Sequence, residues 1–164
     1  MMELSEIFTD DEILNLRLAV SRVFNLISEN GEKLDKKEIR AYEKFISKAR
    51  RLESELAVEL FTGIDNFQVL DEKRKSSGLD DREGLRYISA LLDRKSERDV
   101  AVDYKKTLLA LGYYIANASG SIFGDKVDDD EITELILIGN DLELSYREMF
   151  NSNQIQRIIS MIEE

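Results

Sequence analysis

Apolar residues recur at intervals of three or four along most of the chain, which is the spacing of one face of an α-helix. Behind Thr9, the first such stripe consists of Ile13, Leu16, Val20, Phe24 and Ile27. A second stripe, between Asp35 and Gly63, consists of Ile39, Tyr42, Phe45, Ala49, Leu52, Leu56 and Leu60. No alternating pattern of useful length competes with this spacing. The chain is therefore predicted to be all-α.

Further stripes predict helices over residues 64–70, 80–92, about 96–118, 128–142 and 145–162, so that about seven helices are expected in all. Residues 71–81 are rich in charge, Ser and Gly and are predicted to form a loop. Five predicted helix starts carry a capping residue followed three positions later by Glu: Thr9 and Glu12, Asp35 and Glu38, Asp80 and Glu83, Asp128 and Glu131, Ser145 and Glu148. Such a pair satisfies free backbone N–H groups at the start of a helix.

One short segment occurs twice. Residues 32–39 (EKLDKKEI) follow a helix that ends near Gly31, and residues 125–132 (DKVDDDEI) follow a helix that ends near Gly120. Internal repetition of this kind indicates a duplicated architecture. We predict a single domain over residues 1–164, with pseudo-repeats over about 10–70 and about 82–162 and the charged loop 71–81 between them.

Composition narrows the chemistry. The chain has 164 residues and contains no Cys and no His. Disulfides, thiolate metal sites and thiol nucleophiles are therefore excluded, and the commonest general base is missing. No Gly-rich phosphate loop precedes a Lys-Ser or Lys-Thr pair, and the carboxylates stand in polar turns rather than among apolar residues that would separate their pKa values. We expect a protein that is not an enzyme.

The location is predicted from two absences. The start, Met1 to Glu6, is acidic and lacks the basic segment of a secretory signal. The longest mostly apolar stretch, Thr107 to Ala118, is too short to span a bilayer. The cytoplasm is the expected location.

The formal net charge is −11, but it is unevenly spread. Residues 119–164 carry 11 acidic and 3 basic residues, whereas residues 33–51 carry 8 basic and 3 acidic ones. Within the basic segment, a row at steps of four consists of Lys36, Arg40, Lys44 and Lys48. This row is either a solvated helix face or a docking stripe for an acidic partner, such as the acidic end of a second copy. The overall acidity argues against direct binding of nucleic acid.

The acidic turn before the predicted helix at 128–142 offers the oxygen ligands that Ca²⁺ and Mg²⁺ prefer. Its candidate ligands are Asp125, Asp128 and Glu131, and Asp35 and Glu38 are the corresponding pair in the first half. The spacing is not that of an EF-hand loop. The same residues equally fit helix capping, in which Asp128 accepts from backbone N–H groups and contributes ~1 kcal/mol. Both interpretations fit the sequence.

These residues also carry a resemblance to a family. The stretch from Leu108 to Leu144 resembles the TerB-like (tellurite-resistance B) domains, which have an alanine-rich helix ending in Ala-x-Ala-Asp-Gly, an acidic loop and an acid-x-x-Glu helix start. Those domains are internally duplicated and all-helical, so that residues 18–49 fit as the partner repeat. The resemblance covers about residues 10–162.

The resemblance implies a weak divalent cation, Ca²⁺ or Mg²⁺, at the two turns, with Asp35, Glu38, Asp128 and Glu131 at the matching positions. The Asp of the family's Asp-Gly pair is replaced here, by Asn30 in the first turn and by Ser119 in the second. The family is linked to stress and tellurite resistance, to defence against phage and to assemblies that lie near the membrane through their partners.

We therefore expect a binding or scaffolding module of a stress or defence response, which recognises a protein partner through its acidic C-terminal half. One alternative is a small acidic inhibitor that mimics nucleic acid and blocks a basic groove on another protein, because a strongly negative surface speeds association with a positive one. Another is an architectural subunit that forms homo-oligomers through the basic row.

Overall fold

The computed structural model describes residues 2–28, 36–64, 66–119, 129–150 and 153–164. These ranges contain no strand, which confirms the all-α prediction. Their helices are α1 (Leu4–Ile7), α2 (Asp10–Ile27), α3 (Lys36–Ser47), α4 (Glu55–Thr62), α5 (Phe67–Lys75), α6 (Asp81–Lys95), α7 (Arg98–Ser119), α8 (Asp129–Asp141), α9 (Tyr146–Phe150) and α10 (Asn153–Glu163), with a 3-10 turn, η2 (Ala49–Arg51).

Three of the predicted helix starts are capped as expected. The Thr9 hydroxyl accepts from the Glu12 N–H at 3.2 Å while the Glu12 carboxylate accepts from the Thr9 N–H at 2.8 Å. Ser145 and Glu148 form the same reciprocal pair at 3.2 and 2.8 Å. The Asp80 carboxylate accepts from the Glu83 N–H at 2.8 Å. Asp35 and Asp128, the caps predicted for α3 and α8, lie outside the described residues.

The number of helices exceeds the expected seven because two predicted helices are each divided and α1 is added. The helix predicted between Asp35 and Gly63 ends at Ser47 and resumes as α4, where the Ser54 hydroxyl accepts from the Ala57 N–H at 3.1 Å. Leu52 and Leu56 lie on either side of this start and are both buried. The apolar stripe thus continues across a break that the Ser54 cap stabilises. The last predicted helix is divided into α9 and α10.

The loop predicted over residues 71–81 is wrong in its first half, because α5 continues to Lys75. Asp71 holds Arg74 at 2.8 Å and Lys75 at 3.3 Å, and pairs at these spacings support a helix. The charges that suggested a loop are therefore the polar face of a helix whose other face buries Phe67 and Leu70. The connection to α6 begins at Ser76.

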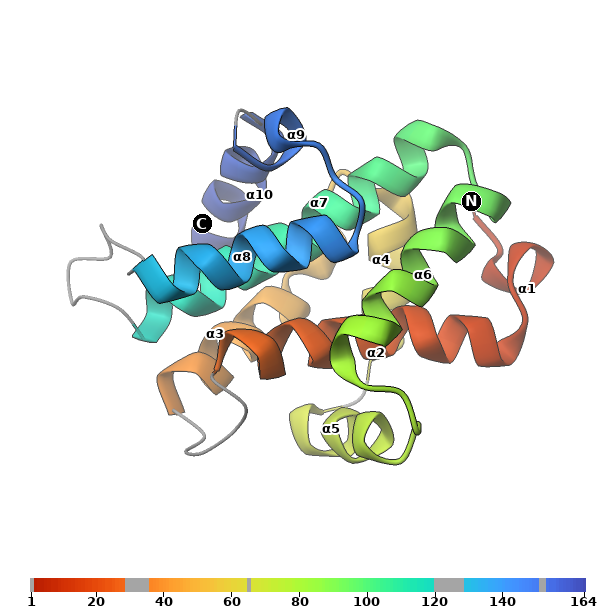
Figure 1. Cartoon of the computed structure of the whole chain (residues 1–164), viewed down its shortest axis with the longest axis horizontal. Coiled ribbons are helices and arrows are strands. Elements are labelled where there is room, and N and C mark those ends of the chain that lie inside the picture. Colours follow the sequence, from red (N-terminus) through yellow and green to blue (C-terminus); the bar gives the residue numbers. More distant parts are fainter. Residues whose placement is uncertain (1, 29–35, 65, 120–128, 151–152) are drawn as a thin grey trace.

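Two long helices, α2 and α7, pack against each other at the centre of the bundle (Figure 1). α2 also contacts α5, α6 and α8, while α7 also contacts α3, α8 and α10. Edge-to-face aromatic contacts join the first half, with the Phe24 ring 5.8 Å from Tyr42 and 4.6 Å from Phe67. Because α2 of the first predicted pseudo-repeat packs on α6, α7 and α8 of the second, the core is continuous between the two. In the described ranges, no helix combines the length and apolarity needed to cross a bilayer.

Candidate functional site

The residues predicted to bind a cation stand at the starts of α3 and α8. Asp35, Asp125 and Asp128 lie outside the described residues, and so does the side chain of Glu131, whose backbone is in the first turn of α8. Glu38 is in the first turn of α3 and is 5% exposed. Among the described side chains, no group of three or more acids is placed to hold a metal ion. The cation site therefore stays a prediction.

The helices that flank the two predicted turns end on the same side of the bundle. The end of α2, the start of α3, the end of α7 and the start of α8 all lie at the left of Figure 1. α3 packs on α7, and α8 packs on α2. Each helix pair therefore contacts the long helix of the other pair, and the fold brings the borders of the two acidic segments to one end of the molecule.

The basic row on α3 lies partly against the chain's own C-terminal helix. The Lys48 ammonium donates to the Ile162 carbonyl at 2.8 Å, and Lys44 lies 3.4 Å from the Glu163 carboxylate. Cations are favoured at this position because the last carbonyls of a helix are unpaired and partly negative. Hydrogen bonding with the Tyr114 hydroxyl, followed by Glu163, raises the pKa of Lys44. Half of the predicted docking stripe is thus used within the chain, while Lys36 and Arg40 remain exposed.

Part of the acidity of the C-terminal half is likewise neutralised within the chain. Arg82 of α6 donates to Glu134 at 2.6 Å and to Asp141 at 2.8 Å, and Arg86 donates to Asp141 at 3.0 Å. Although burial lowers the pKa of Arg82, the hydrogen bonds to Asp141 and Glu134 outweigh it and the pKa is raised. These contacts join α6 to α8, while Glu143, which follows α8, is exposed.

An exposed tyrosine, Tyr146, packs on the half-buried Phe150 where α9 follows α8. Tyr146 is 71% exposed, and its ring centroid lies 4.7 Å from that of Phe150. Tyr113 of α7 lies nearby, since its pKa is raised first by burial and then by Tyr146. The Met149 side chain of α9 packs closely on Gly139 of α8, because a Cβ added at Gly139 would lie 2.0 Å from the Met149 sulfur. We call Tyr113, Tyr146 and Phe150 the Tyr146 surface.

No protein-family model, curated protein or solved structure matches this chain.

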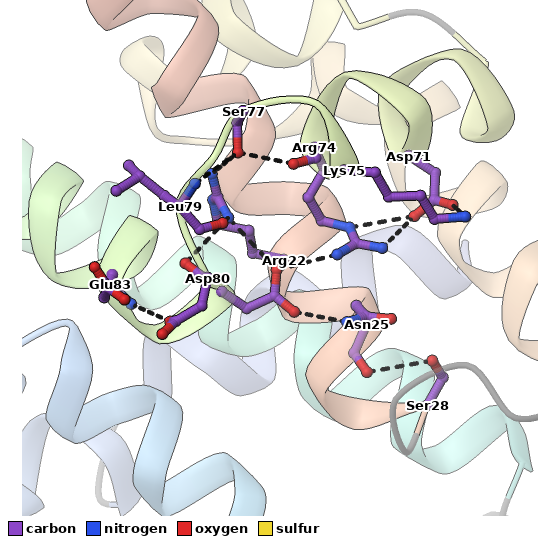
Figure 2. A network of polar contacts seen from close by, with 11 residues as sticks. Arg22, Asn25, Ser28, Asp71, Arg74, Lys75, Ser77, Leu79, Asp80 and Glu83 are labelled. Carbon is purple, nitrogen blue, oxygen red and sulfur yellow. Dashed lines mark hydrogen bonds and ion pairs between the residues drawn. The ribbon is translucent and has the colours of Figure 1, made fainter.

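Arg22, a buried arginine, stabilises the connection between α5 and α6. Arg22 of α2 is 1% exposed and donates to the carbonyls of Leu79 and Asp80, at 3.1 and 3.2 Å, and to the Ser77 hydroxyl at 3.0 Å. Figure 2 shows Arg22 reaching from α2 into the connection between α5 and α6. Burial lowers the pKa of Arg22, and the charge of Asp81, 3.5 Å away, opposes that effect. This network fixes the α5–α6 connection.

Glycine at position 84 makes room for that network. A Cβ added at Gly84 would lie 2.2 Å from Arg22 Nε. The α6 backbone therefore passes over the guanidinium at a distance that only glycine allows.

Two of these features were missed from the sequence. By spacing, Tyr146 belongs to the apolar stripe of the helix predicted over residues 145–162, together with Met149, Phe150 and Ile155, although its ring is exposed. Arg22 was not singled out, although a signal was present: it stands four residues from both Leu18 and Leu26, which are buried. Residues four apart share a helix face, so that an arginine between two core leucines indicates a buried guanidinium.

Proposed function

We propose that the protein is a non-catalytic binding module, TerB-like in architecture, that docks a basic partner protein in a stress or defence response through the Tyr146 surface. The observation that carries this proposal is the exposure of Tyr146. Tyrosine is enriched at the energetic centres of interfaces because it offers a large rigid ring and a polar tip. An exposed tyrosine whose ring already packs on a second ring, 4.7 Å from Phe150, is therefore a candidate anchor.

The charge of the segment that carries Tyr146 supports a basic partner. Residues 129–150 carry seven acidic residues and one basic residue. Two of the acids, Glu134 and Asp141, are neutralised by arginines of α6, but Glu143 is exposed. A basic partner would approach faster and with more specificity than a neutral one, because complementary charges steer encounter.

Tyr146→Ser is expected to weaken partner binding by a factor of ten or more, because an aromatic anchor at an interface centre contributes about 2 kcal/mol or more. The partner is first identified by placing a photo-crosslinking amino acid at position 146 in the source cells. Its affinity is then measured by calorimetry. Tyr87→Ser is the matched control, because Tyr87 is also exposed, at 36%, but lies on α6.

Equal losses for the Tyr146 and Tyr87 variants would overturn the Tyr146 surface as the docking site. The same titration at two salt concentrations separates the acidic-inhibitor alternative. Binding that is insensitive to Tyr146→Ser and falls steeply with salt would favour a nucleic-acid mimic, because exposed charge pairs are screened by ions.

The duplicated TerB-like architecture is part of this proposal. It is supported by the two helix pairs, α2 with α3 and α7 with α8: in each pair, the end of the first helix and the start of the second lie at the same end of the bundle. In such an architecture the two acidic turns would act together, and a Ca²⁺ or Mg²⁺ ion at Asp125, Asp128 and Glu131 would tune partner binding.

A cation at this turn would raise the thermal midpoint of the wild type and not that of Asp128→Asn/Glu131→Gln. An ion present at 100 times its dissociation constant stabilises the fold by about 2.7 kcal/mol if it binds the folded state alone. The measurement is thermal unfolding with EDTA, Ca²⁺ or Mg²⁺. Asp80→Asn/Glu83→Gln is the matched control, because it changes the same pair of residue types at the start of α6. If neither cation changes the thermal midpoint of any of the three proteins relative to EDTA, these acids act as helix caps only.

A further inference from the structure

A cleft lies where α3, α7 and α10 meet, beside the basic row. Its volume is about 460 Å³, and it is lined by Lys37, Arg40, Ala41, Lys44, Tyr114, Asn117, Ala118, Ile159 and Glu163. Three of these residues are cationic and only Glu163 is anionic. In a chain with a net charge of −11, this is a local reversal of sign.

Arg40 and Lys44 are cations of the cleft that a ligand can reach. Arg40 makes no hydrogen bond or ion pair with any residue that the structure describes. Lys44 is paired with Glu163 at 3.4 Å, but both side chains are substantially exposed, at 40% and 58%. Exposed pairs of this kind contribute little and exchange readily with other anions. Asn117 also lines the cleft and adds an amide donor beside the Tyr114 hydroxyl.

The remaining lining is apolar and comes from Ala41, Ala118 and Ile159. A volume of this order, with a few convergent polar groups on an apolar wall, is typical of sites for small molecules. The combination selects a ligand with an anionic head and a short apolar body.

Glu163 indicates which anion the cleft accepts. Its carboxylate lies beside Lys44, and both Glu163 and Lys44 perturb the pKa of Tyr114, which is raised mainly by burial. A carboxylate of the chain itself is therefore already held at the polar end of the cleft. We propose that the cleft binds a small organic carboxylate with a short apolar chain, whose carboxylate replaces that of Glu163 beside Lys44 and Arg40.

The acidity of the rest of the chain does not prevent this binding. At physiological ionic strength, charges separated by more than about 8 Å through solvent are largely screened. The ligand therefore experiences mainly the cations that line the cleft.

The test is an NMR titration of the ¹⁵N-labelled full chain with valerate, with its neutral isostere valeramide and with inorganic phosphate. Valerate should shift the side-chain amide signals of Asn117 and the Nε–H signal of Arg40, and valeramide should not. Arg40→Gln should weaken valerate binding about tenfold, because it removes a charge-assisted hydrogen bond. Glu163→Gln should tighten valerate binding about threefold, because it removes the competing carboxylate.

Lys36→Met is the matched control, because Lys36 is a cation of the same helix that does not line the cleft. The proposal is overturned if Lys36→Met weakens valerate binding as much as Arg40→Gln, or if valerate shifts none of these signals. It is also overturned if phosphate binds as tightly as valerate, which would make the apolar wall irrelevant. Shifts of the same signals on raising the protein concentration alone would instead identify a second copy as the occupant.

Discussion

Arg22→Met is expected to lower the free energy of unfolding by about 3 to 5 kcal/mol, the range for removing one partner of a buried charged network. The methionine fills much of the same space, but it leaves the Leu79 carbonyl without a donor. The Asp80 carbonyl still accepts from the Gly84 N–H at 2.9 Å, and the Ser77 hydroxyl still accepts from the Leu79 N–H at 3.4 Å. A polar group without a partner in the folded chain is costly because it has lost its hydrogen bond to water and gained none within the protein. Asp81 is less affected, since Asn25 donates to it at 2.6 Å and Arg74 at 3.3 Å.

The measurement is urea unfolding followed by circular dichroism. Arg17→Met serves as the control on the same helix, because Arg17 is half-buried and donates once, to the Leu60 carbonyl at 2.9 Å. That variant is expected to lose about 1 kcal/mol, the net contribution of a single hydrogen bond. If the two variants unfold at the same urea concentration, the network around Arg22 adds nothing beyond an ordinary arginine contact.

Phe24→Ala is expected to cost a similar amount, about 3 to 5 kcal/mol, because it opens a cavity where three aromatic rings meet. Phe24 is buried and contacts Tyr42 of α3 and Phe67 of α5 with its ring edge-to-face to both, and the Tyr42 and Phe67 centroids are 5.3 Å apart. Removal of the ring therefore removes packing between three helices, α2, α3 and α5.

Phe24→Leu keeps most of the volume and should cost less than about 1.5 kcal/mol. Both variants are compared by the same urea experiment, and the cavity in Phe24→Ala is checked by its uptake of xenon. Equal stabilities of the Ala and Leu variants would show that the neighbouring helices close onto the vacated space.

Local chemistry made the helix starts predictable. Thr9, Asp80 and Ser145 cap helices as their sequence spacing indicates, because the cap and its partner Glu are only three residues apart. The start of α4 was not predicted, although Ser54 also caps a helix, because the apolar stripe runs through the break. The period of a stripe records which residues are buried and does not record where the backbone is interrupted.

Exposure and long-range pairing were harder to predict than helices. The apolar stripe of the last helix gave no sign that Tyr146 is exposed while Met149 is buried, because α9 ends at Phe150 and its orientation is set by packing at Gly139. The contacts between the α3 lysines and the end of α10 join residues more than a hundred positions apart. Only the fold places such residues together, and the cleft beside them could not be inferred from the basic row.

The central position of α7 has a consequence for synthesis of the chain on the ribosome. α2 and α3 belong to the first half, yet much of the surface that covers them comes from α7, and the Phe45 ring of α3 lies 6.0 Å from Tyr114. Domains that depend on distant contacts cannot complete their packing until the later segment has emerged. The nascent first half therefore exposes its apolar faces until α7 is translated, and a ribosome-stalled chain ending near residue 80 should bind chaperones and resist protease poorly.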